Sequence, residues 1–343
     1  MLTVQIPLGA SYQYISVTDA VTKFTGYSNN PVVVTYATSG VGSFNSFAQT
    51  QNISVGSDAI QHVIKDFNGD GKPDIVVASY ADKTVYLFTN TTTPTSVSIT
   101  LSVPQVIFTL SGSAIIALAA DDLDGDGKPD LALGNWNNGT LIIYKNIAAM
   151  VGGAISFTNT GVSLSGIIQP YSIAIADIDT DGRPDIIMAS SNAGAGTTVN
   201  IFRNTSASGT INFDPTVNVT SVGTALQRVV IGDINGDGRP DLLTANNNAN
   251  NVSILQNTST GPGSITFAAS YNFAAGGASY GLAVGDFNGD GWLDLAVANA
   301  GANQISILRN TAQTGTINAG SFGPVVTVSS TNPFMVAVGD VNG

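Results

Sequence analysis

The chain contains no cysteine and no glutamate, only one histidine, and few charged residues, which make up 10% of its 343 positions. Without cysteine, no disulfide bond can stabilise the fold. Without glutamate, and with His62 as the single imidazole, few side chains remain for acid–base catalysis. The sequence contains no run of basic residues of the kind that binds nucleic acid, and it contains no apolar run as long as a transmembrane helix. We therefore expect a protein that neither binds nucleic acid nor inserts into a membrane.

The acidic residues are all aspartates, and their distribution is uneven. Of the 23 aspartates, 18 lie in a nine-residue loop that recurs five times and begins a sixth time at Asp340. The five complete copies occupy residues 66–74, 122–130, 177–185, 233–241 and 286–294. The first aspartates of successive copies are 53 to 56 residues apart. A period of this length is typical of one supersecondary unit in a repeat protein.

The chemistry of this loop favours a hard cation. Side-chain oxygens occupy loop positions 1, 3, 5 and 9, and glycine occupies position 6, where the chain turns sharply, as calcium loops require. A single copy would fit a tight turn without metal equally well, but five copies with the same oxygen positions favour calcium. An EF-hand would need a glutamate at position 12, and the sequence has none. The sequence therefore predicts about five calcium sites, which would offset most of the formal net charge of −12.

Each repeat also predicts four β-strands. One short apolar run leads into the acidic loop and a second leaves it, as is typical of strands that are buried on both faces. These runs lie at 115–119, 173–176, 229–231, 282–284 and 335–338 before the loops, and at 75–78, 131–133, 186–188, 242–243 and 295–297 after them. A third strand is expected at 140–144, 199–202, 252–255 and 305–308, and a fourth at 155–157 and 265–267. Four antiparallel strands per repeat favour an all-β fold, a β-propeller, over a stacked solenoid.

The two ends leave the number of blades open between six and seven. Residues 31–36 and 42–47 match the third and fourth strands of a repeat, and residues 334–340 match a first strand. The ends can therefore combine into one blade that closes a six-bladed ring. Alternatively, residues 31–343 form a seven-bladed propeller whose C-terminal blade is incomplete, and residues 1–30 are the tail of a preceding immunoglobulin-like module. We favour the seven-bladed interpretation, in a chain that is part of a larger secreted protein.

The pattern Val-Gly-Asp-Phe-Asn-Gly-Asp-Gly-Trp-Leu-Asp-Leu-Ala-Val at 284–297 resembles the FG-GAP/VCBS repeat family, and the other four copies are similar. The family includes integrin α-like calcium-binding propellers, propeller lectins and bacterial secreted or surface proteins. The resemblance implies one calcium ion in each acidic loop, bound by the side chains at positions 1, 3, 5 and 9 and by the carbonyl of position 7. The implied ligands are Asp66, Asn68, Asp70, Lys72 and Asp74; Asp122, Asp124, Asp126, Lys128 and Asp130; Asp177, Asp179, Asp181, Arg183 and Asp185; Asp233, Asn235, Asp237, Arg239 and Asp241; and Asp286, Asn288, Asp290, Trp292 and Asp294.

The sequence favours a binding function over catalysis. Only five aspartates lie outside the acidic loops, so a pair of catalytic carboxylates has few candidates. Aromatic residues in turns or just ahead of first strands can bind sugar rings, and the candidates are Tyr80, Trp136, Tyr171 and Tyr280. We expect a non-catalytic adhesion or recognition module for glycans or extracellular proteins, secreted or at the cell surface. A polysaccharide lyase with a calcium ion at its rim, and a structural spacer in a large surface protein or filament, are the alternatives.

Overall fold

The computed structural model shows an all-β protein. It describes residues 13–18, 25–32, 53–94, 99–110, 114–149, 152–190, 197–220, 223–312 and 315–339. Five sheets of four strands follow one another along the chain, and within each sheet every strand pairs antiparallel with the next. The predicted all-β architecture of four-stranded units is therefore confirmed.

The strand bounds follow the repeat closely. The first sheet contains β3 (Ala59–Lys65), β4 (Asp74–Ser79), β5 (Thr84–Phe88) and β6 (Gln105–Thr109), and the second β7 (Ile115–Asp121), β8 (Asp130–Asn135), β9 (Thr140–Asn146) and β10 (Phe157–Leu164). The third contains β11 (Pro170–Ala176), β12 (Asp185–Ser190), β13 (Thr198–Phe202) and β14 (Val217–Thr220). The fourth contains β15 (Leu226–Gly232), β16 (Asp241–Asn246), β17 (Asn251–Leu255) and β18 (Tyr271–Ala274), and the fifth β19 (Ser279–Gly285), β20 (Asp294–Asn299), β21 (Gln304–Leu308) and β22 (Val326–Ser329).

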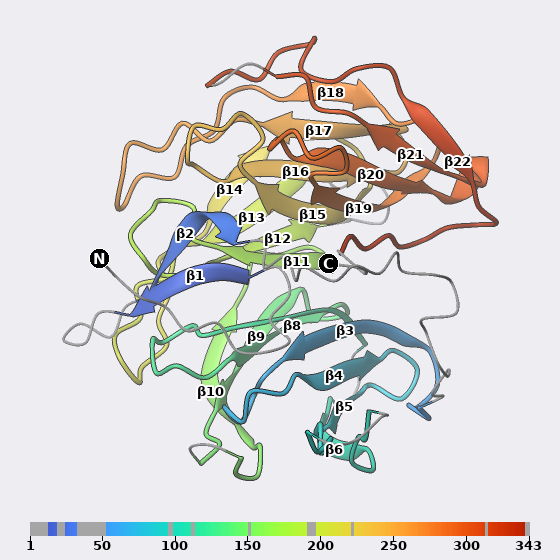
Figure 1. Cartoon of the computed structure of the whole chain (residues 1–343). Helices are drawn as coiled ribbons and strands as arrows, with labels where there is room; N and C mark the ends of the chain where they lie inside the picture. Colours follow the sequence, from blue (N-terminus) through green and yellow to red (C-terminus); the bar gives the residue numbers. More distant parts are fainter. Residues whose placement is uncertain are drawn as a thin grey trace.

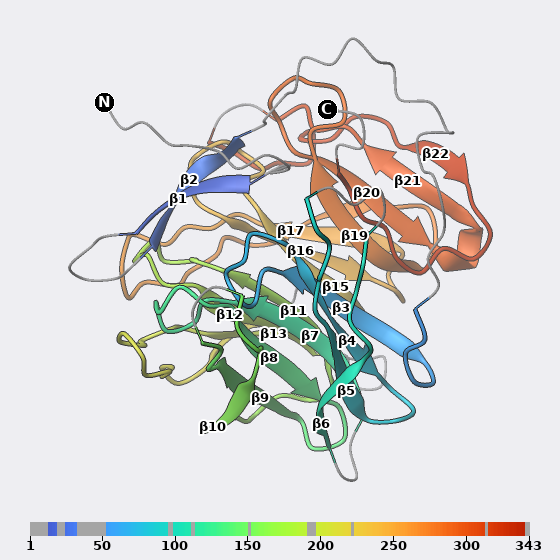
Figure 2. The same cartoon turned by 60° about the horizontal axis from the view of Figure 1, so that its bottom comes forward.

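The sheets are arranged as the blades of a propeller (Figure 1). The first strands β3, β7, β11, β15 and β19 contact one another in this order, and each second strand from β4 to β16 contacts the first strand of the next sheet. The fourth strands β6, β10 and β22 lie at the periphery (Figure 2). Each blade therefore has its first strand innermost, and the loop between its first two strands lies at one end of the inner edge.

The hydrophobic core lies between neighbouring blades. Every residue of β8, β12, β16 and β20 is buried. This is expected for β8, β12 and β16, which have a sheet on each side. One cluster, for example, joins Leu243 and Ile254 of the fourth sheet to Leu282 and Leu295 of the fifth. Burial of these side chains between the blades is the main stabilising contribution in a fold without disulfides.

The predicted positions of two fourth strands were wrong. The fourth strand of the second sheet begins at Phe157 instead of ending there, and that of the fourth sheet, β18, lies at 271–274 instead of 265–267. In the fourth repeat, Phe267 forms only an isolated bridge to Asn257. Regular pairing with β17 resumes only at Tyr271.

The two ends of the propeller differ from its middle. Residues 334–338 do not form a strand, although rings of Tyr280 in β19 and Phe334 lie 4.7 Å apart. The other end of the propeller is β3, the first strand of the first sheet. Its residues Ile60 and Ile64 are exposed, and it borders an apolar groove of about 280 Å³.

A separate two-stranded sheet pairs β1 (Gln13–Thr18) with β2 (Thr25–Val32). Residues 33–36 and 42–47, expected as strands, lie outside the described residues. The assignment of residues 1–30 and the choice between six and seven blades stay predictions.

Candidate metal centres

Each acidic loop connects the first and second strands of one sheet. The last residue pair of the hairpin closes the loop, as in Lys65 with Asp74 and Gly232 with Asp241. The loop therefore begins and ends at fixed points of a paired ladder. This rigid frame holds all the predicted ligand residues of one copy within a single tight turn.

The aspartate at loop position 9 is the anchor of the turn. Its side chain is 0 or 1% exposed in all five copies, Asp74, Asp130, Asp185, Asp241 and Asp294. One oxygen accepts the backbone N–H of loop position 2 at 2.9–3.1 Å, and the other accepts the N–H of an asparagine at or just after the end of the third strand at 2.7–2.8 Å. Two such charge-assisted bonds hold the carboxylate at one orientation.

The aspartate at position 1 closes the turn from the other side. In the third loop, Asp177 accepts the N–H of Asp181 at 3.0 Å and that of Gly182 at 2.8 Å. Position 6 has a φ of +82° to +88° in every copy, in the left-handed region that glycine adopts without strain. The same pair of bonds recurs in the other four loops. This explains why position 6 is always glycine.

The carboxylates of positions 1, 3 and 9 converge in the second and third loops. Oxygens of Asp122, Asp124 and Asp130 lie within 4.8 Å of one another, and so do those of the corresponding three residues of the third loop, Asp177, Asp179 and Asp185. In the first, fourth and fifth loops, position 3 is an asparagine, which offers an amide oxygen instead. At position 5, one oxygen of the aspartate accepts the N–H of position 7 at 2.9–3.1 Å.

Basic side chains contact the loops in numbers that match their acidic residues. The first loop has Lys72 on Asp70 at 3.0 Å, the fourth has Arg239 on Asp237 at 2.6 Å, and the fifth has Arg309 on Asp290 at 3.2 Å. The second and third loops, which have one more aspartate, have two basic contacts each: Lys128 and Lys145, and Arg183 and Arg203. Counting these side chains alone, every loop therefore carries a formal charge of −2.

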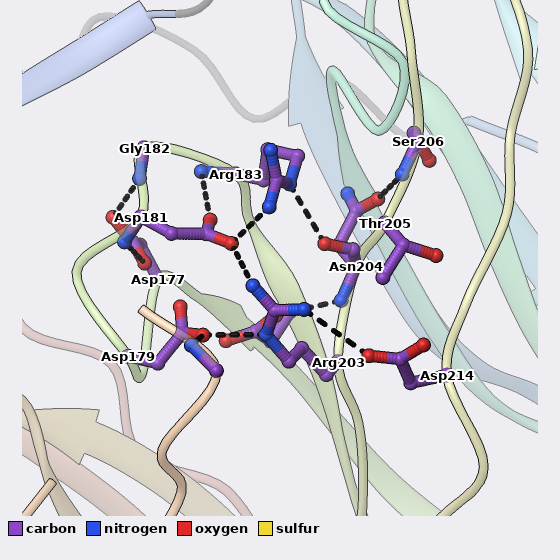
Figure 3. A network of polar contacts seen from close by, with 12 residues as sticks. Asp177, Asp179, Asp181, Gly182, Arg183, Arg203, Asn204, Thr205, Ser206 and Asp214 are labelled. Atoms are coloured by element: carbon purple, nitrogen blue, oxygen red, sulfur yellow. Dashed lines mark hydrogen bonds and ion pairs between the residues drawn. The ribbon is translucent and has the colours of Figure 1, made fainter. Parts of the chain in front are cut away.

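The third loop contains a buried oxygen without a partner. Arg203 binds Asp179 at 2.5 Å and Asp181 at 2.6 Å, and its third contact is Asp214, outside the loop, at 3.1 Å (Figure 3). Among the described residues, these contacts leave Oδ1 of Asp179, a residue with 0% exposure, with no hydrogen-bond partner. Such an orphaned acceptor is costly unless a cation or donor satisfies it. Because carboxylate and amide oxygens are the ligands that calcium prefers, the residues present fit this ion.

Burial has a strong effect on the acidity of these carboxylates. It raises the pKa of Asp130 to about 8, that of Asp185 and Asp241 to about 7, and that of Asp122 and Asp177 to about 6, despite the backbone bonds that lower them. Neighbouring loop carboxylates raise these pKa values further. A bound divalent cation would favour the charged forms and offset this cost.

The next sheet covers each of the first four loops. The asparagine that binds position 9 also reaches across the blade boundary: Asn257, for example, donates from Nδ2 to the carbonyl of Ile178 in the third loop at 2.9 Å. The corresponding bonds run from Asn146 to Phe67, from Asn204 to Leu123 and from Asn310 to Ile234, at 2.8–2.9 Å. We call these four asparagines the latch. Each of the first four acidic loops is thereby hydrogen-bonded to the blade that follows it.

A glycine-containing turn of the following blade also touches three of these loops through its backbone. Gly263 donates to Asp179 at 2.6 Å, and Gly152 and Gly315 donate to the carbonyls of Asn68 and Asn235 at 3.0 and 2.8 Å. In the second loop, Lys145 connects the loop to the carbonyl of Gly209 at 3.2 Å. The fifth loop has no such cover among the described residues, and Phe287 is 40% exposed there.

The aromatic candidates lie at the end of the blades opposite the acidic loops. Tyr171 and Tyr280 are the second residues of β11 and β19, inside the first strands instead of ahead of them. The rings of Trp136 and Tyr171 pack edge to face at 5.6 Å. Tyr80 follows β4 and is 41% exposed. The structure brings Trp136 and Tyr171 together; it gives Tyr80 no contact with them.

The sequence analysis predicted neither the basic side chains that contact the acidic loops nor the hydrogen bonds that the latch asparagines form with the preceding blade. Lys145 and Arg203 lie 21 and 24 residues after the aspartates they bind, so nothing local indicates the pairs. The latch asparagines could have been found from their spacing. Four of the five asparagines at the ends of third strands lie 16 residues beyond the position 9 aspartate, and Asn204 lies 19 residues beyond it. A polar residue that recurs at a fixed offset indicates a shared structural role.

Comparison with known families identifies the repeats. The model of the FG-GAP-like repeat matches residues 66–133, 122–188, 177–244 and 233–297, and that of the FG-GAP repeat matches residues 278–317. No curated protein matches the chain. Among the described residues, no helix has the length and apolar character needed to cross a membrane.

Solved structures support the fold. A protein from Lactobacillus plantarum is 13% identical with a TM-score of 0.54, over 91% of this chain and 77% of that one. A provisional 6-phosphogluconolactonase from Bacteroides fragilis is 17% identical with a TM-score of 0.51, over 79% and 71%. A lectin from Agrocybe aegerita that recognises non-reducing terminal N-acetylglucosamine is 17% identical with a TM-score of 0.47, over 95% and 76%. At these identities the first two likenesses concern the fold alone.

Proposed function

Because the chain belongs to the FG-GAP-like repeat family, we propose that it is a calcium-stabilised propeller that acts as a non-catalytic recognition module outside the cell. Five acidic loops would each hold one calcium ion between the first two strands of a blade. The opposite rim, with its aromatic residues, would bind a glycan or an extracellular protein.

The observation that carries the calcium proposal is the charge of the loops. Despite different numbers of aspartates, each loop with its basic contacts has a formal charge of −2, which one divalent cation neutralises. The orphaned Oδ1 of Asp179 and the converging oxygens of the second and third loops add to this argument. The side chains at positions 1, 3, 5 and 9 and the carbonyl of position 7 would bind the ion, and the latch would connect each ion-bound loop to the next blade.

An extracellular location agrees with the expected affinity. Calcium sites of extracellular modules have dissociation constants of about 0.1 to 1 mM. At about 0.1 mM affinity and about 1 mM free calcium, each ion would stabilise the fold by about 1.4 kcal/mol. Five ions would then contribute about 7 kcal/mol, which is comparable with the net stability of a typical domain.

The role in recognition is supported by the structural contacts that hold three of the four described aspartates outside the acidic loops. In the part of the chain that the structure describes, Asp82 accepts bonds from Ser57, Ser79 and Tyr86, and Asp121 lies 3.8 Å from Lys65. Asp214 pairs with Arg203. These three aspartates outside the loops therefore have structural partners. The rim instead presents aromatic faces, which suit sugar rings.

Elemental analysis and a glycan array test the two parts of this proposal. We expect about five calcium ions per chain at millimolar calcium, and binding to a subset of glycans that is lost in EDTA as the fold loosens. Fewer than two bound ions would contradict the calcium assignment. Turnover of a polysaccharide, read as unsaturated products, would contradict the non-catalytic assignment.

A further inference from the structure

Two buried polar atoms without partners lie at the aromatic end of the fourth sheet. In the described residues, Oε1 of Gln227 and Nδ2 of Asn247 have no hydrogen bond, and Asp179 Oδ1 is the one other such side-chain atom. Both residues adjoin one carbonyl, that of Ala225: Asn247 donates to it from its backbone N–H at 3.1 Å and Gln227 from Nε2 at 3.4 Å. The two residues with an unsatisfied side-chain atom therefore contact the same carbonyl group.

Arg228, the next residue, is a partly buried cation without an acidic partner. The other four arginines each pair with at least one aspartate of an acidic loop, whereas no ion pair or hydrogen bond joins the guanidinium group of Arg228 to the described residues. Burial lowers the pKa of its guanidinium. A desolvated charge without a counter-charge is costly, so this position indicates an anion that the chain itself does not supply.

The repeat shows how unusual this position is. In each first strand the ladder skips one residue near its start, and the skipped residues are Ile60, Ile116, Tyr171, Gln227 and Tyr280. The residues that follow them are Gln61, Ala117, Ser172, Arg228 and Gly281. Arg228 is therefore the single charged side chain at this level of the five inner strands.

Tyrosines lie on the inner strands of the two neighbouring blades, at the ladder position of Gln227. The backbone N–H of Val229 donates to Oγ of Ser172 at 3.2 Å, which fixes β15 against β11 beside Tyr171. On the other side, β15 contacts β19, which carries Tyr280. Tyr171, Gln227 and Tyr280 thus occupy the same position on three adjacent inner strands, and all three side chains are partly exposed.

We propose that this rim of β15, between Tyr171 and Tyr280, binds a carboxylate-bearing sugar. Arg228 would pair with the carboxylate in the bidentate geometry that guanidinium favours. Gln227 and Asn247 would bind hydroxyl groups, since rotation about the last, soft side-chain torsion exposes their orphaned atoms. The tyrosine rings would cover the apolar face of the sugar. This inference rests on the proposed recognition function and adds the charge class of the ligand.

Binding of D-galacturonate and D-galactose to the calcium-loaded full chain, measured by ligand-observed NMR and calorimetry, tests the proposal. We expect galacturonate to bind at least tenfold more tightly than galactose, and Arg228→Gln to weaken galacturonate binding about tenfold or more. Lys83→Gln removes one positive charge from a turn of the first sheet and should leave binding unchanged. The calcium-dependent rise in melting temperature should persist in both variants, which shows that they fold.

Equal binding of the two sugars, or unchanged galacturonate binding in Arg228→Gln, would overturn the proposal while leaving recognition of other glycans intact. No binding of galacturonate at 10 mM, on the order of the weakest affinities that matter here, would also overturn it. Loss of the calcium effect on melting would instead count against the proposed function, so the two failures are distinguishable.

Discussion

The acidic loops of the third and fifth sheets have the same length and the same aspartates at positions 1, 5 and 9, yet their surroundings differ. In the third loop, Asp179 is 0% exposed and is contacted by Arg203 and by Gly263 of the next sheet. In the fifth, Asn288 occupies the corresponding position and is exposed, and the side chain of Arg309 is 64% exposed. The motif determines the conformation of the turn, whereas contacts from the following blade determine how much of the loop is exposed to solvent.

Removal of calcium from all loops should have the largest effect. We expect excess EDTA to lower the free energy of unfolding by up to about 7 kcal/mol at 1 mM reference calcium, because every loop then retains a charge of −2. Calorimetric titration should resolve at least one weaker site, assigned to the fifth loop. A melting temperature that does not change in EDTA would contradict the account, and magnesium in place of calcium serves as the control.

Loss of Arg203 should destabilise the third loop more than loss of Arg309 destabilises the fifth. Arg203→Gln removes the guanidinium contact of Asp179 and one of the two guanidinium contacts of Asp181, and we expect a cost of about 2 kcal/mol in EDTA, less than for a fully buried pair because the guanidinium is partly exposed. Calcium should reduce this cost, since the ion supplies positive charge. The matched variant Arg309→Gln should show no measurable change in denaturant unfolding. Equal effects of the two variants would refute the comparison.

The contribution of the latch can be measured with two asparagines. Asn257→Ala removes the bond to Ile178 of the preceding blade and its own contact with Pro240, whereas Asn90→Ala removes the bond to Pro73 within its own blade. We expect Asn257→Ala to be more destabilising by about 1 kcal/mol, the net value of one buried hydrogen bond. Urea unfolding of both variants in calcium gives this difference. A difference near zero would mean that the blades do not depend on the latch.

The pH dependence without metal should have the opposite sign to that of most acidic proteins. The raised pKa values of Asp130, Asp185 and Asp241 mean that the folded state binds more protons than the unfolded state between about pH 4 and 8. Stability in EDTA should therefore fall by a few degrees in melting temperature as the pH rises from 5 to 8. In calcium the trend should be absent or reversed, because the ion requires ionised ligands. Parallel trends in the two buffers would contradict the assignment.

Much of the fold follows from the repeat itself. The first three strands of each blade were predictable, because buried strands between two sheets require the continuous apolar runs seen at 131–133 and 186–188. The fourth strands were not, because they lie at the periphery with mostly exposed or partly buried residues, as in β10 and β18. Such strands lack the continuous apolar run that marks a strand buried on both faces.

The candidate site divides in the same way. The turn at each acidic loop was predictable from its aspartates and glycine, since those residues act within nine positions. Whether they bind calcium stays a prediction. The basic contacts from Lys145 and Arg203, and the partnerless Arg228, became visible only when the third strands and the blade boundaries were in place.

The latch gives the assembly a direction. Every cover over an acidic loop is supplied by the repeat that comes later in the chain, and none of the latch bonds runs the other way. Duplication of the last repeat would therefore place a covering blade over the fifth acidic loop and leave the acidic loop of the new repeat uncovered. The contacts between the existing blades would stay unchanged. Such a one-way design lets evolution lengthen or shorten the array by whole units without redesigning any existing boundary.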